Sequence, residues 1–209
     1  MKKNNFFVFL LILFHANCLI AQQNLNLIID YVKTSHVPSE LKNMMPELTK
    51  LQPVLFRYEY AGGKSVYRFI EGIGESRFKP IGKVNIYKNL ENKILYISLV
   101  DDAKSVFKDT LICENWKLHS GEEREIAGFL CHKASSDHEF VVWYCENIPV
   151  SDGPLEQTCG LPGMILAVKW GDTIIEATRV ELSNSNGAVE IPLAEKYLSA
   201  DEFRQRFKR

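Results

Sequence analysis

Four cysteines in the second half of the chain are the residues whose type and spacing most directly suggest chemistry. They are Cys113, Cys131, Cys145 and Cys159. Thiolate and imidazole groups bind zinc or copper when several of them meet at one ion. His132 directly follows Cys131, however, and neighbouring residues of a strand point to opposite faces of a sheet. No metal ligand is therefore assigned, and a periplasmic Cys/His metal-binding protein stays an alternative function.

The sequence lacks the short motifs of the common enzyme classes. It contains no Gly-x-Ser-x-Gly, no His-Glu-x-x-His, no phosphate-binding loop and no Cys-x-x-Cys. Ser120-Gly121 and Ser151-Asp152 are typical of turns, and His119 and His138 fall in expected loops. We therefore expect a protein that is not an enzyme and holds no cofactor. The enzymatic alternative is a hydrolase whose Asp, His and Ser come from distant segments.

The N-terminus has the pattern of a secretory signal peptide. Lys2 and Lys3 precede an apolar run from Phe6 to Phe14, and the polarity then rises before Ala21. A positive start, an apolar stretch of about 7–15 residues and a small residue before the cut define such a signal. We expect cleavage after Ala21, which makes residues 1–21 the signal peptide and residues 22–209 a single domain.

The mature protein is expected to be soluble outside the cytoplasm, in the periplasm or secreted. Cys18 offers lipidation as an alternative, but a small residue should precede a lipidated cysteine and Asn17 stands there. No later stretch is apolar enough to span a membrane, which takes roughly 20 residues. The chain carries 25 Lys and Arg against 26 Asp and Glu. Without a basic cluster, this balance offers no binding surface for nucleic acid.

Alternating apolar and polar residues dominate the mature sequence and predict strands with one buried face. The clearest case is a hairpin around Gly62-Gly63, since two glycines tolerate the positive φ angles of a tight turn. Its register pairs Tyr60 with Ser65, Tyr58 with Tyr67 and Phe56 with Phe69. These aromatic side chains form either a core face or the floor of an apolar cavity.

About ten strands follow one another in the expected fold, with helices only near the two ends. Residues 39–52 indicate a short helix or a draped loop. Ser199 and Glu202 have the spacing of a capping box before Phe203 and Phe207, which predicts a short terminal helix. We expect a mainly β protein with a single curved antiparallel sheet or half-barrel. The expected strands cover 25–31, 54–60, 65–69, 84–88, 94–99, 106–118, 128–134, 140–145, 164–170 and 173–182.

Four cysteines in an exported chain suggest two disulfides, and three pairings are possible. If strands 111–118 and 128–133 pair around the charged loop 119–126, Cys113 lies opposite Cys131. A turn near Ser136-Asp137 then places Cys131 opposite Val142 rather than Cys145. We therefore predict the pairs Cys113–Cys131 and Cys145–Cys159.

One segment, residues 143–166, is rich in proline and glycine and enters an apolar strand. Its hexapeptide Gly160 to Ile165 resembles the signature of the GLPGLI family, and the upstream residues Trp116, Gly128 and Cys131 to Ala134 resemble that family too. This chain departs from the usual pattern at Cys145 and Cys159, and it has Leu155 where an aromatic residue is common. The motif residues of the resemblance are Trp143, Ile148, Pro149, Gly153, Pro154, Gly160, Leu161, Pro162 and Gly163.

The resemblance implies an exported protein of the Bacteroidota without established activity. It also implies a fold like that of LolA/LolB-type lipoprotein carriers, and an accessory role beside outer-membrane TonB-dependent receptors. The expected function is therefore a non-catalytic envelope protein that binds a partner protein, such as a receptor, on its curved sheet. The alternative with the same fold is a carrier of lipid or another apolar ligand. The motif segment itself is expected to be a rigid turn, with partner recognition as its alternative.

Overall fold

The computed structural model describes residues 25–36, 43–44, 53–72, 84–100, 105–183, 187–194 and 196–206. The expected signal peptide lies outside the described residues, as does most of the expected helix 39–52. Within the described residues, no helix has both the length and the apolar character needed to cross a membrane.

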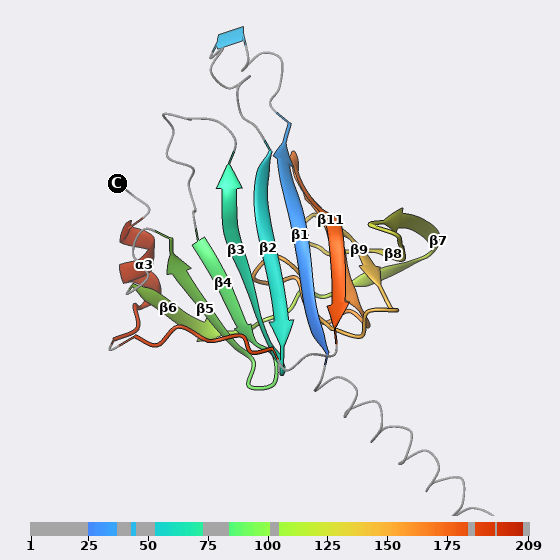
Figure 1. Cartoon of the computed structure of the whole chain (residues 1–209). Helices are drawn as coiled ribbons and strands as arrows, with labels where there is room; N and C mark the ends of the chain where they lie inside the picture. The colour runs from blue at the N-terminus through green and yellow to red at the C-terminus, as the bar shows by residue number, and fades with distance from the viewer. Residues whose placement is uncertain are drawn as a thin grey trace, which may run out of the picture.

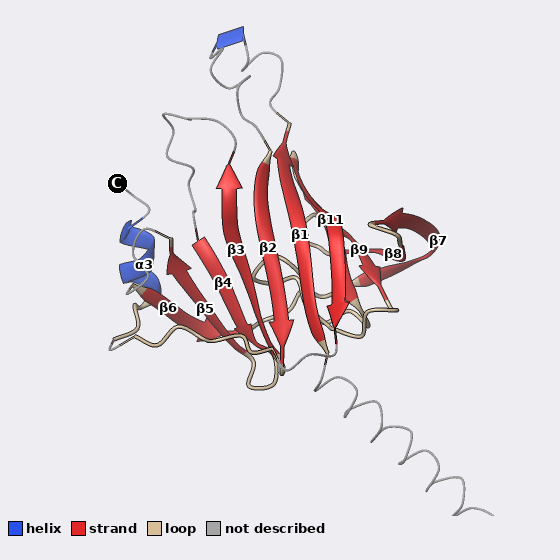
Figure 2. Ribbon diagram, viewed as in Figure 1, coloured by secondary structure: helices blue, strands red, loops and turns tan. Residues whose placement is uncertain are grey.

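In these residues eleven strands form one antiparallel sheet, which confirms the expected mainly β class (Figures 1 and 2). Along the sheet the order is β6-β5-β4-β3-β2-β1-β11-β10-β9-β8-β7, so β6 and β7 are its two edges and the sheet is open. The strands are β1 (Asn26–Ser35), β2 (Val54–Ala61), β3 (Lys64–Gly72), β4 (Val84–Asn89), β5 (Ile94–Leu99), β6 (Val106–Thr110), β7 (Lys117–Ile126), β8 (Phe129–Ser135), β9 (Phe140–Cys145), β10 (Met164–Trp170) and β11 (Thr173–Ser183).

The hairpin of β2 and β3 has the predicted register. Tyr58 lies opposite Tyr67 and Phe56 opposite Phe69, with Gly62 and Gly63 at positive φ in the turn. Phe56 also stacks on Tyr67 with ring centroids 4.6 Å apart. The aromatic face therefore belongs to the core, which was the first of its two predicted roles.

The two halves of the chain meet at the centre of the sheet, where β1 pairs with β11. The chain must therefore travel from one edge to the other between β6 and β7. Residues 111–116, which we call the crossing segment, make this connection. The predicted strand 106–118 is wrong, because β6 ends at Thr110 and the supposed loop 119–126 belongs to β7. Charged residues suit β7 because both faces of much of this edge strand are exposed.

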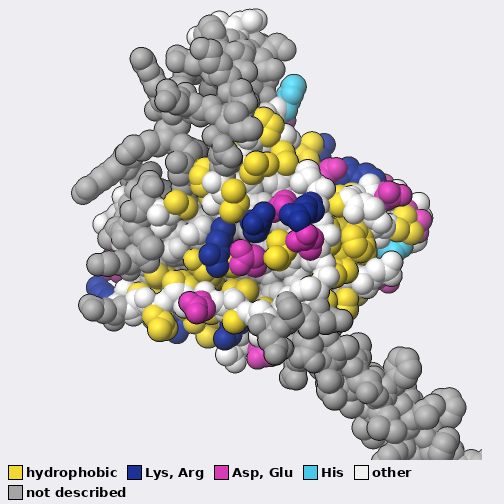
Figure 3. All heavy atoms as spheres, viewed as in Figure 1, with side chains coloured by type: hydrophobic (Ala, Val, Ile, Leu, Met, Phe, Trp, Pro, Cys, Tyr) yellow, Lys and Arg dark blue, Asp and Glu magenta, His cyan; other side chains and the backbone are white. Residues whose placement is uncertain are grey.

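The outer face of the central strands carries a network of ion pairs. Arg57 Nε lies 2.8 Å from Asp30 Oδ1, and Arg179 Nη1 lies 3.4 Å from Asp30 Oδ2. Arg68 and Glu59 add a pair at 3.7 Å. Figure 3 shows these opposite charges interleaved over this face, with hydrophobic side chains around them. The opposite faces of the same strands bury Leu27, Ile29 and Tyr31 of β1 and Phe56, Tyr58 and Tyr60 of β2.

Helix α3 (Ala200–Arg206) begins with the predicted capping box. The Ser199 amide donates to Glu202 Oε2 at 2.8 Å, and the Glu202 amide donates to Ser199 Oγ at 3.3 Å. Phe203 stacks on Phe107 of β6 with centroids 5.0 Å apart, so the helix packs beside the edge of the sheet (Figure 1). Phe207 lies outside the described residues.

Candidate functional site

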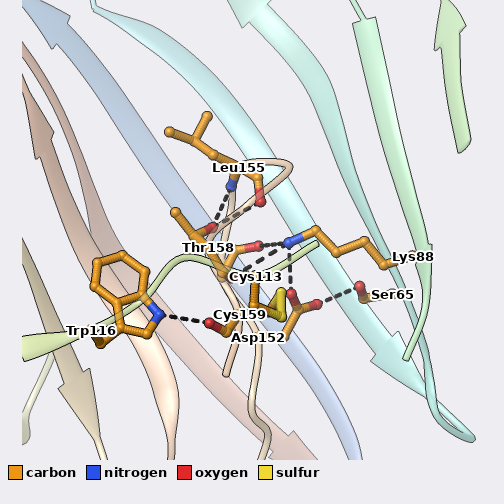
Figure 4. The surroundings of a disulfide bond; sticks show 9 residues. Ser65, Lys88, Cys113, Trp116, Asp152, Leu155, Thr158 and Cys159 are labelled. Carbon is orange, nitrogen blue, oxygen red and sulfur yellow. Dashed lines mark hydrogen bonds and ion pairs between the residues drawn. A yellow bond between two sulfur atoms is a disulfide. The ribbon is translucent and has the colours of Figure 1, made fainter. Parts of the chain in front are cut away.

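Residues 146–163, which we call the motif loop, lie against the inner face of β2, β3 and β4. Asp152 of this loop anchors it there (Figure 4). Lys88 Nζ of β4 lies 2.7 Å from Asp152 Oδ1 and donates to the Gly153 carbonyl at 2.9 Å. Tyr58 and Ser65 both donate to Asp152 Oδ2, at 2.8 and 2.5 Å. Three strands thus hold one loop carboxylate.

This ion pair is withdrawn from solvent. The exposed fractions of the Lys88 and Asp152 side chains are 2% and 0%. Burial of two charges is tolerable only when each finds its full set of hydrogen-bond partners, and here both oxygens of the carboxylate are occupied. Burial, together with the negative charge of Asp152, raises the pKa of Tyr58 well above its ordinary value. The cluster therefore fixes the loop and is closed to a ligand.

A disulfide between Cys113 and Cys159 joins the crossing segment to the motif loop, with a Cα–Cα distance of 5.0 Å. Trp116 supports it by donating from Nε1 to the Cys159 carbonyl at 2.7 Å (Figure 4). The Glu114 amide also donates to the Gln157 carbonyl at 3.1 Å. The crossing segment and the motif loop therefore form one unit.

The predicted disulfides Cys113–Cys131 and Cys145–Cys159 are wrong in this structure. Cys113 lies before β7 begins, and Arg124 takes the place opposite Cys131. Cys131 and Cys145 are buried thiols. His132 lies opposite Tyr144. Because the two strands are antiparallel, the next pair is Cys131 and Cys145, so Cys131 does not lie opposite Val142 as expected. Burial, with a smaller contribution from Cys145, raises the pKa of the Cys131 thiol to about 12.

Two glycines of the motif loop are required by close contacts. A Cβ on Gly163 would lie 2.1 Å from the carbonyl oxygen of Cys145, and one on Gly153 would lie 2.8 Å from Thr158 Oγ1. Gly160 has a φ of +90° beside the Cys113 side chain. Replacing Gly163 must therefore move the backbone of β9 or of the loop. These contacts support the expected rigid turn.

The other motif residues serve mainly to pack the loop. Ile148 and Leu161 belong to the core and Pro154 is also buried, whereas Pro149 and Pro162 are exposed. Trp143 is half-buried on β9, and the Arg124 guanidinium lies 4.4 Å from its ring centroid. Among the predicted site residues, Cys113 lines the cleft described next.

A cleft of about 750 Å³ opens beside the motif loop. One wall is the inner face of the sheet, and the other is formed by residues 112–115 and 155–157. On the sheet wall, Ile175 lies between Lys33 and Val168 in the register of β1, β11 and β10. The next row along the same wall consists of Thr173, Trp170 and Phe140, on β11, β10 and β9. Most of the sheet wall is therefore apolar or aromatic.

Several apolar side chains in the cleft meet solvent. Trp170 is 54% exposed and Ile112 is 71% exposed. The Phe140 and Trp170 rings stack with centroids 5.7 Å apart. Leu155 faces the cleft from the motif loop, at the position where the resemblance led us to expect an aromatic residue. Pockets of this size and composition typically bind small molecules.

Charged groups stand at separate places around the cleft. Lys33 belongs to the sheet wall, and burial lowers its pKa. Glu156 belongs to the loop wall, and burial raises its pKa. At the turn before β9, His138 Nδ1 lies 2.9 Å from Glu114 Oε2, so this pair joins the two walls. The bond to Glu114 raises the pKa of His138.

The sequence did not reveal Lys33, Glu156 or Lys88 as site residues. Lys88 occupies an inward position of β4 where the alternation calls for an apolar residue, and this was a sequence signal that Lys88 has a buried partner. Lys33 continues the inward series of Leu27, Ile29 and Tyr31 and gave a similar signal. In the described part of the chain, no three His, Cys, Asp or Glu side chains gather as metal ligands.

The comparisons with known proteins agree with this fold. A family described as "Protein of unknown function (Porph_ging)" matches residues 135–167, which run from the end of β8 through the motif loop into β10. No curated protein matches the chain. Two crystal forms of PNGF-II resemble it with TM-scores of 0.59 and 0.57, at 17% and 16% identity. Each match covers 88% of this chain and 33% of the PNGF-II chain, so this chain spans about a third of PNGF-II. At this identity the likeness shows the fold alone.

Proposed function

We propose that this protein is a non-catalytic binding protein that holds a small apolar or amphipathic molecule in the cleft beside the motif loop. The observation that carries the proposal is the cleft itself, with a volume of about 750 Å³ and exposed Trp170 and Ile112 on opposite walls. A ligand that covers apolar side chains exposed to water in a concave site lowers the free energy of the complex.

A partner protein on the concave sheet is supported less well. The motif loop already lies on the inner face of β2 to β4, where Asp152 meets Tyr58 and Lys88. Part of the remaining inner face, on β1, β11, β10 and β9, is one wall of the cleft, with the loop wall opposite it. Of the functions considered from the sequence, the geometry therefore favours the ligand carrier over the receptor accessory.

The proposed setting is the cell envelope. The pattern of residues 1–21 supports export, and the Cys113–Cys159 disulfide is compatible with an oxidising compartment. The hexapeptide Gly160 to Ile165 lies inside the segment matched by the unknown-function family, and we propose that the chain is of the GLPGLI type. A TonB-dependent receptor would then take part in delivery of the ligand and would not itself occupy the cleft.

The test uses a probe that fluoresces in apolar sites. The protein is expressed as the full chain in a bacterial host, purified, and titrated with the neutral probe phenylnaphthylamine. We expect saturable binding, and about tenfold weaker binding by Trp170→Ala, because the variant removes an exposed aromatic wall. Leu118→Ala is the matched control, since Leu118 is 56% exposed on β7 but lies outside the cleft lining.

Two results would contradict the proposal. One is a wild-type protein that shows no saturable probe binding while its circular dichroism is that of a folded β protein. The other is an equal loss of binding in Trp170→Ala and Leu118→Ala, because the probe would then bind exposed apolar residues in general. Native mass spectrometry of the purified protein adds a direct search for a retained ligand.

A further inference from the structure

Lys33 occupies an unusual position for a lysine. Along β1 it follows Leu27, Ile29 and Tyr31 on the inward-facing side of the strand. Its neighbours across the sheet are Val54 on β2 and Ile175 on β11. Lys33 thus stands between two apolar residues of the sheet and lines the cleft.

This ammonium group has no partner within the described residues. The cleft lining contains three acidic residues, but Glu114 pairs with His138, Asp137 precedes the same histidine, and the charge that acts on Glu156 is Lys88 rather than Lys33. Burial alone lowers the pKa of Lys33, so no carboxylate acts on it strongly enough to offset that effect. A partly desolvated cation without a counter-ion is costly, and the site gains when an anion arrives.

The geometry points to an amphipathic ligand whose anionic head group pairs with Lys33 Nζ while its apolar chain lies along Ile175 and Val168 toward Trp170. This inference rests on the proposed function and names the class of molecule bound at that same site. The head group is a carboxylate or a phosphate, because an ammonium group recognises either one as a point charge.

The remaining charges of the cleft agree with this orientation. Glu114, Asp137 and His138 lie at the end formed by the turn before β9 and the crossing segment. Lys33 lies on the opposite side of the sheet wall, two strands away from β10. Glu156 faces the cleft from the motif loop. Burial raises the pKa of Glu156, and the positive charge of Lys88 partly offsets that rise. An anion is therefore favoured beside Lys33 and disfavoured at the acidic end.

The experiment compares ligands that share one chain and differ in the head group. Decanoate, decyl phosphate, decanol and decylammonium each displace phenylnaphthylamine from the full chain at neutral pH. We expect the better of the two anions to bind about tenfold more tightly than decanol, as a charge-assisted contact in a partly dry site allows. The preferred anion then identifies a fatty-acid-like carboxylate or a lipid phosphate as the natural head group.

Two variants locate the effect. Lys33→Gln should bring the anions to within about twofold of decanol while decanol itself binds as in the wild type. Lys33→Arg should keep the preference for anions. Lys169→Gln is the matched control, because Lys169 is exposed on β10 and does not line the cleft.

The outcomes separate the two proposals. If all four ligands displace the probe with equal affinity, or decylammonium binds best, the assignment of Lys33 is overturned and the binding function stands. If the probe does not bind saturably, the binding function itself fails. If the probe binds saturably and none of the four ligands displaces it, the assignment of Lys33 is overturned. An anion preference that survives in Lys33→Gln also overturns the assignment.

Discussion

The residue that joins the two walls of the cleft is His138. Its side chain is 77% exposed, whereas that of its partner Glu114 is 7% exposed. The pair thus consists of a buried carboxylate on the crossing segment and a solvated imidazole on the turn before β9. A pair with one solvated partner contributes little to stability, but its hydrogen bond shifts the titration of a histidine that lines the cleft.

We predict that the pKa of His138 lies above its ordinary value of 6.5, chiefly because of the hydrogen bond to Glu114. Glu114→Gln should bring the pKa down toward that value. A histidine pKa raised by folding stabilises the folded state below the unfolded pKa, and this contribution is lost as pH rises through the folded pKa. Titration of the His138 ring protons by NMR measures the shift. Glu139→Gln is the control, and an unchanged His138 pKa in Glu114→Gln contradicts the assignment.

The motif loop is the element on which the site depends. It forms part of one cleft wall, and it is held to the sheet by Lys88 and Asp152 rather than by strand pairing. The contacts of Gly163 and Gly153 fix its path further. The shape of the cleft therefore depends on interactions that lie outside the cleft.

Removing one partner of the buried ion pair tests this dependence. Lys88→Met should lower the free energy of unfolding by about 3–5 kcal/mol, because it leaves the Asp152 carboxylate buried without its counter-ion. Adding Asp152→Asn should recover part of that loss, since the buried charge is then gone. Urea denaturation measures both variants, with the exposed Lys169→Met as control. A loss below about 1 kcal/mol in Lys88→Met would show that the pair does not hold the loop.

Short-range patterns predicted the elements well. The register of β2 and β3 followed from Gly62-Gly63 and the alternation around it, and the capping box located α3. The path between β6 and β7 could not be predicted, because it depends on β1 pairing with β11, which no local pattern reports. The disulfide was wrong for the same reason. Cys113 belongs to a segment that crosses the sheet, so its partner comes from the motif loop rather than from a hairpin.

At the scale of the whole molecule, the eleven described strands form an open sheet, and two irregular segments cover part of its inner face. The crossing segment connects the two edge strands, and the motif loop packs against β2 to β4. The Cys113–Cys159 bond links these segments over a sequence separation of 46 residues. One covalent bond therefore ties the connection between the edges to the centre of the inner face.

We predict that this bond stabilises the whole fold and shapes the cleft, since Cys113 is part of the lining. Replacing both Cys113 and Cys159 by serine should lower the free energy of unfolding by about 4 kcal/mol, as expected for a closed loop of this length. Phenylnaphthylamine binding should weaken as well, because the loop wall loses its link. Urea denaturation and probe titration measure the two effects.

The two free thiols, Cys131 and Cys145, provide a control for the assignment of the disulfide. Cys131 and Cys145 are completely buried, and a Cys131 pKa of about 12 leaves little thiolate, so neither should react with N-ethylmaleimide in the folded protein. After unfolding without reductant, mass spectrometry of the four cysteines in residues 22–209 should find adducts at Cys131 and Cys145 and a peptide joining Cys113 to Cys159. A peptide joining Cys131 to Cys145, or no adduct at all, contradicts this thiol state. A link from Cys113 to any other cysteine contradicts the crossing path, because only the described topology brings Cys113 beside the motif loop.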